Sequence, residues 1–222
     1  MKHRTHDLQK DGRLQIRNER PEDYRQVEEM TRRAFYNLYV PGCTEHYLVH
    51  VMRSHPDFLP QLDLVAELDG RVVGNIMYTK AALTGPDGEE RQILTFGPIS
   101  VLPEYQRMGI GKLLMEESFR RAAQLGYEVV VITGSPSNYV TCGFQSCKKH
   151  HICLEDGTFP AALLVKELRP GALDGRKYVY RYSPVMQIDE QAAQRFDSGF
   201  EPMEKKHQAS QEEFYILSNA TL

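Results

Sequence analysis

The pattern of apolar and polar positions predicts a strand and two helices in the first quarter of the chain. Apolar and polar residues alternate over 14–18 (L-Q-I-R-N), which predicts a half-buried strand. Apolar residues recur at helical spacing over 21–35, a stretch opened by Pro21. A second helix is predicted over 44–54, between the break at Pro41-Gly42 and Pro56. The order of elements is therefore one strand followed by two helices.

Three antiparallel strands are predicted next, because two turn sequences interrupt apolar-rich runs. Asp69-Gly70 separates 62–68 from 71–82, and Gly85-Pro86-Asp87-Gly88 leads into a strand over 91–101. The later pattern predicts a helix over 109–125, a fully apolar strand over 129–132, a short helix over 137–142, and strands over 144–154 and 161–168. The fully apolar strand is expected to be central and covered on both faces.

The composition changes after Pro170-Gly171. Residues 173–222 hold few apolar runs and two predicted helices, 189–196 and 210–217. Ser210-Gln211-Glu212-Glu213 has the form of a capping box, with Glu213 reaching back to the amide of Ser210. We expect a main domain over 14–168 and a C-terminal extension over 173–222 that packs on it and is a candidate contact in a homodimer.

Composition and charge exclude several classes of protein. The 222 residues are 41% hydrophobic and 26% charged, with a formal net charge of -3, so the basic excess of a nucleic-acid-binding protein is missing. The polar start over 1–7 does not resemble a signal peptide, and the apolar runs are too short to span a bilayer. The four cysteines form no C-x-x-C motif, so reduced thiols are expected. We therefore expect a soluble, cytoplasmic protein with no membrane or nucleic-acid partner.

The most informative segment runs from a strand through a tight turn into the helix that starts near residue 109. The first N–H groups of a helix have no partners within the helix, and its dipole favours an anion there. Gly109 and Gly111 have no side chains that would hold a phosphate away from these donors, and Arg107 and Lys112 add positive charge. A pyrophosphate is the ligand that fits this turn.

Two better-known phosphate loops are excluded. The motif G-x-x-x-x-G-K-[ST] is absent because Leu113 follows Lys112, and G-x-G-x-x-G fails because Leu114 occupies its last position. A nucleotide-binding module would also require a parallel sheet, which the hairpins argue against.

Gln106, Gly109 and Gly111 match the loop [QR]-x-x-G-x-[GA], by which the chain resembles the GCN5-related N-acetyltransferase (GNAT) superfamily. Tyr139-Val140-Thr141-Cys142-Gly143-Phe144 is similar to the family's Y-x-x-x-G-F, and the resemblance extends over about 14–168. It implies an α+β (mixed α/β) fold with a mostly antiparallel twisted sheet of six to seven strands flanked by helices. It also implies acetyl-CoA as cosubstrate, no metal, and direct attack by an amine.

The resemblance assigns the cofactor to two neighbouring segments. The loop residues are Gln106, Arg107, Met108, Gly109, Ile110, Gly111 and Lys112. Gly97-Pro98 interrupts the preceding strand, because a proline cannot complete a ladder, and would splay it from the strand 129–132. The backbone groups of Ile99, Ser100 and Val101 would then be free to pair with the pantetheine arm. The alternative is an ordinary bulge at a sheet edge.

Tyr139 is the candidate general acid that would protonate the leaving thiolate. The alternative is that its ring only packs on the pantetheine. No general base can be identified; Glu67, Asp63 or a chain of waters would serve. Cys142 is expected to be a small buried hydrophobe rather than a nucleophile, since no activating base can be assigned to it.

The acceptor pocket of the family corresponds to the stretch that contains Tyr36, Tyr39 and Tyr47, although these rings could equally pack helix against sheet. His46 and His50 have metal-binding spacing, but H-E-x-x-H is not formed, so histidines facing solvent or substrate are expected instead. His150 and His151 would point to opposite faces of a strand and would not converge on a metal.

The sequence leaves two hypotheses about function open. The first is an acetyl-CoA-dependent N-acetyltransferase that acts on an amine of an unidentified small molecule or peptide. The second is a non-catalytic module of the same fold that binds or senses acyl-CoA. The phenol at position 139 favours the first hypothesis.

Overall fold

A computed structural model describes residue 9 and residues 11–222, which form one mixed sheet with helices on both faces. The polar start at 1–7 lies outside the described residues. The helices are α2 (Tyr24–Phe35), α3 (Glu45–Met52), α4 (Ile110–Gln124), α5 (Pro136–Tyr139), α6 (Glu190–Asp197) and α7 (Ala209–Asn219). The strands are β1 (Leu14–Asn18), β2 (Leu64–Leu68), β3 (Arg71–Thr84), β4 (Glu90–Val101), β5 (Val129–Thr133), β6 (Gln145–Ser146), β7 (Ile152–Cys153), β8 (Leu163–Glu167) and β9 (Tyr178–Arg181).

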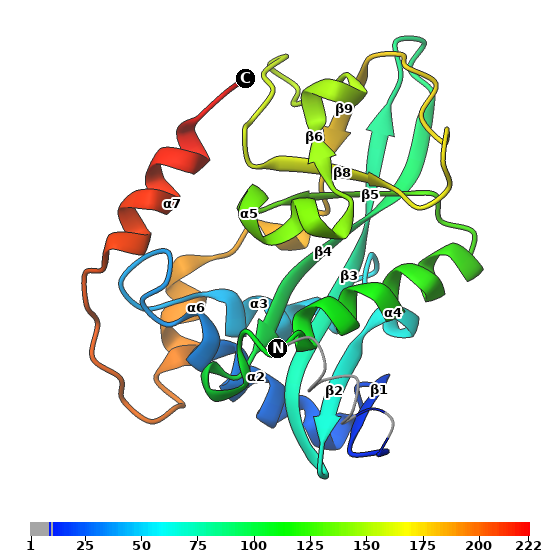
Figure 1. Cartoon of the computed structure of the whole chain (residues 1–222). Helices are drawn as coiled ribbons and strands as arrows, with labels where there is room; N and C mark the ends of the chain where they lie inside the picture. Colours follow the sequence, from blue (N-terminus) through cyan, green and yellow to red (C-terminus); the bar gives the residue numbers. More distant parts are fainter. Residues whose placement is uncertain (1–8, 10) are drawn as a thin grey trace.

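The strands of the described chain lie in the order β1-β2-β3-β4-β5-β8-β6, and β9 pairs with both β3 and β7. Neighbouring strands are antiparallel except for the pairs β4–β5 and β7–β9. The predicted mostly antiparallel sheet flanked by helices is confirmed, although the described chain has nine strands instead of six to seven. Strand β5 lies inside the sheet, between β4 and β8 (Figure 1).

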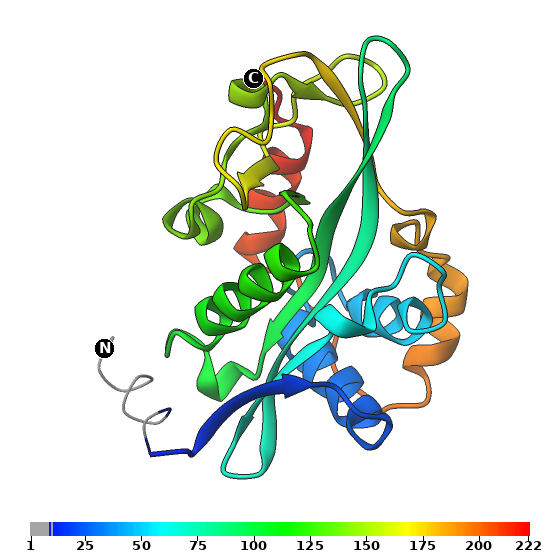
Figure 2. The same ribbon diagram turned by 90° about the vertical axis from the view of Figure 1, so that its right-hand side faces the viewer.

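Helix α4 covers one face of the sheet, and α2, α3 and α6 cover the other (Figure 2). A close approach at Gly74 of β3 positions α4. A Cβ atom at residue 74 would lie 3.0 Å from Leu114 Cδ1 and 3.1 Å from Ile110 Cγ2, so the absence of a side chain there lets the first turns of α4 rest on the strand. Ile110 and Leu114 are both fully buried in this contact.

Strands β4 and β5 diverge after a short contact. Within the described residues, Leu94↔Val130 is the pair that joins the two strands, whereas Ile99, Ser100 and Val101 pair on their other side with β3. The β3–β4 register shifts opposite Gly97-Pro98, as expected where a proline interrupts a ladder. One edge of β4 beyond this point therefore faces a gap instead of a strand.

The single strand predicted over 144–154 is wrong. The chain forms β6, a 3-10 turn over Cys147–His150, and β7. The Ser146 hydroxyl accepts a hydrogen bond from the Lys148 amide at 3.2 Å, and His151 adopts a left-handed φ of 54°. Because the segment turns here, His150 and His151 do not alternate on a strand.

The C-terminal extension contributes a strand that the pattern did not predict, because β9 pairs with the end of β3. Helix α6 is confirmed, and Asp189 caps it by accepting from the amides of Gln191 and Ala192. The capping box of α7 is wrong: the helix begins at Ala209, its N-cap is Gln208, and Ser210 lies inside the first turn. The Gln211 side chain donates instead to the carbonyl oxygens of Asn37 and Lys206, which fixes the chain where α7 begins.

Helix α6 is held to α2 by an ion pair between Arg32 and Asp197 at 2.6 Å. His46 is fully buried, with its Nε2 3.1 Å from the same carboxylate, so the prediction that it faces solvent or substrate is wrong. Burial lowers the pKa of His46 to about 4, and its ring is therefore neutral at pH 7.

Helix α7 stands beside the body of the molecule and bridges two distant loops (Figure 1). Backbone groups of Glu204 and Lys206 bond the Asn37 side chain before the helix, and Thr221 pairs with Pro160 after it. No helix in the part of the chain that the structure describes is long and apolar enough to cross a membrane.

We expect Gly74→Val to destabilise the fold, because its side chain must displace Ile110 and Leu114. Overpacking of this kind costs about 1–3 kcal/mol. Chemical denaturation measures the loss, and Lys80→Val, at a half-buried position of the same strand, is the control. Equal stability of the two variants would contradict the close contact between α4 and β3.

Candidate active site

A cleft of about 670 Å³ lies where the divergence of β4 and β5 leaves the sheet open. It is lined by β4, the start of α4, the α5 region, the α2–α3 region and the segment that includes β9. Its volume lies in the ordinary range of small-molecule sites. Nine of the ten cofactor residues predicted from the sequence line it, namely Ile99, Ser100, Val101, Gln106, Arg107, Gly109, Ile110, Gly111 and Lys112. Met108 is not among the lining residues and packs against the core.

One end of the cleft is the N-terminus of α4. Gly109 is the N-cap with a left-handed φ of 91°, a conformation open to glycine at little cost, and it has no side chain that could accept from the first-turn amides. Arg107 is exposed in the same turn, and Lys112 forms an exposed ion pair with Glu116 at 3.4 Å. First-turn amides that the N-cap side chain does not bond, the helix dipole and two cations are together suited to an anion.

The β4 wall of the cleft carries Ile99 and Val101 on one face and Ser100 on the other. The Ile99 and Val101 side chains flank Gly111, each 3.8 Å from the position of a Cβ atom there. The buried Ser100 hydroxyl lies 3.0 Å from that of Thr31 in α2. The Val101 carbonyl accepts a hydrogen bond from Gln106 Nε2 at 3.1 Å, so the prediction that this carbonyl is free is wrong in this structure.

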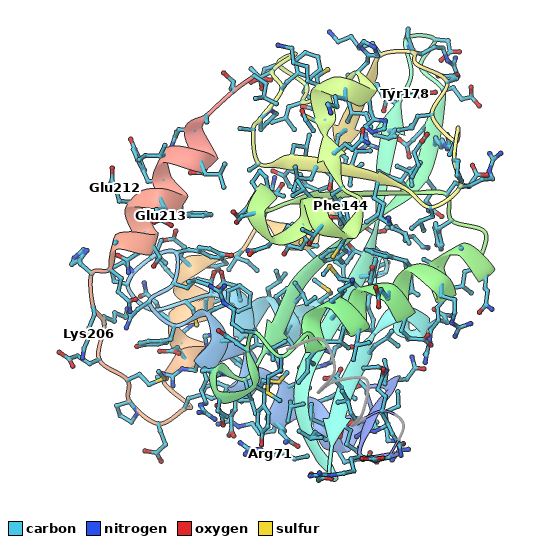
Figure 3. The ribbon with its side chains drawn as sticks, viewed as in Figure 1. Arg71, Phe144, Tyr178, Lys206, Glu212 and Glu213 are labelled. Atoms are coloured by element: carbon cyan, nitrogen blue, oxygen red, sulfur yellow. The ribbon has the colours of Figure 1, made fainter. Side chains whose placement is uncertain are left out.

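Tyr139 closes the side of the cleft that α5 forms. A Cβ atom at Gly134 would lie 2.5 Å from Tyr139 Cε2, so the ring packs directly on that glycine. Its other contacts are Phe96 and Phe144, with centroids 5.9 Å and 5.8 Å away; Phe144, labelled in Figure 3, lies in the interior beside α5. Burial raises the pKa of Tyr139 well above its usual range, so the phenol is protonated at neutral pH.

Of the three tyrosines predicted to bind the acceptor, Tyr39 lines the cleft and Tyr36 and Tyr47 do not. The Tyr36 hydroxyl donates to the Met203 carbonyl at 2.8 Å, and the Tyr47 ring packs on Phe196 of α6 at 5.5 Å. Both rings therefore hold the C-terminal extension against the domain.

Glu45, at the start of α3, is a cleft residue to which the sequence analysis gave no role. Its Oε2 accepts a hydrogen bond from the Thr44 amide at 3.0 Å, which orients the carboxyl group. Burial raises the pKa of Glu45 above its usual range. Burial raises the pKa of Tyr39, and the nearby Glu45 raises it further. Burial likewise raises the pKa of Tyr139, and the nearby Tyr39 adds to that shift. Glu45, Tyr39 and Tyr139 are therefore successive neighbours in the cleft.

The C-terminal extension also lines the cleft, through Tyr180, Tyr182 and Met186. These residues were not predicted from the sequence, because no strand was expected after residue 168. The alternating run Tyr178-Val179-Tyr180-Arg181 was the signal that could have revealed one.

The two carboxylates considered as bases lie elsewhere. Glu67 pairs with Arg17 at 2.7 Å, and Asp63 is buried beside Glu19, which raises the pKa of Asp63 to about 9. Neither lines the cleft. Cys142 does, at a half-buried position. Among the described residues no group of three or more His, Cys, Asp or Glu side chains could hold a metal ion.

Replacing Glu45 with glutamine should stabilise the protein at pH 8. The folded-state pKa of Glu45 lies above its unfolded value, so the folded chain binds this proton more tightly and loses stability as the pH rises through that interval. Glutamine has no charge to desolvate, so the gain should vanish below the ordinary carboxyl pKa. Urea denaturation of wild type and Glu45→Gln at pH 4 and pH 8 measures the difference in their free energy of unfolding. An equal difference at both pH values would contradict the raised pKa of Glu45.

Comparisons with known proteins agree with this geometry. The model of the acetyltransferase (GNAT) family matches residues 32–146. The uncharacterized N-acetyltransferase YjhQ of Escherichia coli K12 is 35% identical over 89 residues, which are 40% of this chain and 48% of that protein. The chain thus matches about half the length of this curated relative.

Two solved structures resemble most of this chain. The GNAT family N-acetyltransferase YhbS from Escherichia coli, in complex with CoA, has a TM-score of 0.68 and 27% identity over 78% of this chain and 92% of that one. A GNAT family acetyltransferase from Brucella melitensis, in complex with acetyl-CoA, has a TM-score of 0.62 and 26% identity over 78% and 98%. The chain belongs to the acetyltransferase (GNAT) family.

Proposed function

We propose that this chain is an acetyl-CoA-dependent N-acetyltransferase in which an acceptor amine attacks the thioester directly. The observation that carries the proposal is one cleft that joins the anion-binding start of α4, the open edge of β4 and the phenol of Tyr139. The structures of two relatives with CoA or acetyl-CoA bound support it.

In this proposal the diphosphate of coenzyme A binds the first-turn amides of α4, with Arg107 and Lys112 beside it. The pantetheine arm follows the edge of β4 over Ile99, Ser100 and Val101 and pairs with the strand as an added strand would. Gln106 must then release the carbonyl of Val101, since the cofactor's amide would take its place. The acetyl group would reach the bend at Gly97-Pro98.

The reaction needs a neutral amine, a polarised carbonyl and a proton for the thiolate. The amine nitrogen forms a bond to the carbonyl carbon, and the carbon–sulfur bond breaks. The thiolate takes the phenolic proton of Tyr139, and a proton from the nitrogen then restores the phenol. The raised pKa keeps Tyr139 protonated before the reaction. It also makes proton transfer less favourable, so the same apolar surroundings must raise the basicity of the thiolate.

The proposal includes a cytoplasmic setting, which supplies acetyl-CoA and keeps thiols reduced. The four cysteines, all within the described chain, form no disulfide bond.

Gly109→Ala should weaken CoA binding, because a left-handed φ costs an alanine about 1–2 kcal/mol and relief of that strain would turn the amides away. Loss of hydrogen bonds to a charged group, about 1.5–3 kcal/mol, corresponds to a Kd roughly ten- to a hundredfold higher. The matched control is Gly88→Ala in the β3–β4 turn, where φ is 80° and no atom lies within 4 Å of the new Cβ. Calorimetry should give that control the wild-type Kd; equal losses in both variants would refute the assignment.

Tyr139→Phe should lower kcat about 10²- to 10⁴-fold, the usual range for loss of a general acid, while the Kd for acetyl-CoA stays within about twofold. A thiol-release assay with acetyl-CoA and a panel of amines measures kcat. Undiminished kcat would mean that the ring only packs on the cofactor. Tight acetyl-CoA binding by the wild type without turnover of any amine would instead favour the non-catalytic module.

A further inference from the structure

The charges around the cleft are distributed unevenly. Of the described residues that line it, those with ionic side chains are Arg107, Lys112 and Glu45. The two cations lie at the start of α4, where the diphosphate is proposed to bind. Glu45 lies at the start of α3, beside Tyr39, where the acceptor is proposed to bind. This part of the cleft, the acceptor half, presents one carboxylate and no cation among the described lining residues.

The rest of the acceptor half is apolar and largely aromatic. Phe35, Leu38 and Leu48 line it from the α2–α3 side, and Tyr182 and Met186 line it from the extension. The Tyr39 ring is held in place by Phe214 of α7, whose ring stacks on it at a centroid distance of 4.6 Å and an angle of 29°. Burial of an apolar body against these surfaces is favourable, whereas burial of a polar body without hydrogen-bond partners is unfavourable.

This lining selects among amines. A polyamine would leave all but one of its cations without a carboxylate, and an amino acid would place its carboxylate where no described cation can pair with it. An amine with one charge and an apolar body satisfies both constraints. Glu45 can bind its ammonium, since the backbone amides of Thr44 and Glu45 occupy only part of the acceptor capacity of the carboxylate.

We propose that the acceptor is a primary amine with a single positive charge and an aromatic or branched aliphatic body, whose ammonium group pairs with Glu45 in the acceptor half of the cleft. The proposal rests on the acetyl transfer proposed above and adds the class of substrate and the residue that selects it.

The ammonium gives one proton to Glu45, which releases it to water, and the neutral nitrogen then forms its bond to the acetyl carbon. The carbon–sulfur bond breaks, the thiolate takes the proton of Tyr139, and the second proton of the nitrogen returns to the Tyr139 oxygen. The products are the acetamide, free CoA and one proton.

The surroundings of Glu45 suit this exchange. Among the described residues, the titratable groups whose pKa values the Glu45 carboxylate raises are Tyr39, on the chain after α2, and Cys43, on the loop before α3. Burial raises the pKa of both groups, so both are uncharged at pH 7 and neither competes with an ammonium for the carboxylate.

The experiment compares three acceptors in the thiol-release assay with saturating acetyl-CoA. The probes are 2-phenylethylamine, phenylalanine and spermidine. Phenylalanine has the body of 2-phenylethylamine with an added carboxylate, and spermidine has several cations and no ring. We expect kcat/KM for 2-phenylethylamine to exceed that for each of the others at least about tenfold, the equivalent of about 1.4 kcal/mol. A higher value for phenylalanine or spermidine would overturn the proposed class.

Glu45→Gln separates a role in acceptor binding from a general effect on the fold. It should lower kcat/KM for 2-phenylethylamine about 10²-fold or more and remove the acid limb of its pH profile, while the Kd for acetyl-CoA stays within about twofold. The control is Glu212→Gln, an exposed position on α7 that should leave all these values unchanged (Figure 3). An unaltered pH profile in Glu45→Gln would overturn the role of this residue.

Calorimetry distinguishes the two levels of the proposal. If the protein binds neither CoA nor acetyl-CoA, the proposed acetyl transfer fails, and the acceptor class fails with it. If acetyl-CoA binds but no probe turns over, the CoA-loaded protein is titrated with 2-phenylethylamine. Binding that weakens at least tenfold in Glu45→Gln would support the acceptor site, and absence of binding would overturn it alone.

Discussion

The site depends on one constraint: the first turn of α4 must lie beside an edge of β4 that β5 leaves open. An isolated helix N-terminus attracts anions of any kind, and an isolated strand edge pairs with any extended chain. Held next to each other, they fit a ligand that has a diphosphate at one end and an amide-bearing arm at the other. Coenzyme A has this chemistry.

Small residues at close contacts maintain this arrangement. Gly74 lets α4 approach β3, the register shift at Gly97-Pro98 accompanies the separation of β4 from β5, and Gly134 admits the ring of Tyr139. These contacts come from segments that are distant in the sequence, so the cleft is a property of the packed sheet rather than of one loop. The C-terminal extension completes it from outside, because β9 joins the sheet and α7 supports Tyr39.

The helices and strands that were predicted well are those whose sequence signals lie within the element itself. The turn at Asp69-Gly70, the helical spacing after Gly109 and the apolar run of β5 each specify their own conformation, and the structure has these elements within a few residues of the predicted bounds. The segment 144–154 has a strand-like composition, yet it turns at Ser146, which bonds the Lys148 amide instead of continuing a ladder. In α7, a capping-box spacing was overridden by the bonds that Gln211 makes to a distant loop.

The proposed cofactor end of the site could be identified from the sequence because its motif, 106–112, lies within seven consecutive residues. The acceptor end could not, since Glu45, Tyr39 and Tyr182 come together only through the packing of α3 and the β9 segment against the sheet. Nothing in the neighbourhood of Glu45 in the sequence separates it from the exposed acids on the surface.

The most direct measurement is a pair of calorimetric titrations of the wild-type protein, one with CoA and one with pantetheine, which lacks the diphosphate. If the amides at the start of α4 bind the diphosphate, CoA should bind at least about a hundredfold more tightly than pantetheine, a difference of about 2.7 kcal/mol. Equal affinities, or no heat with CoA, would contradict the account.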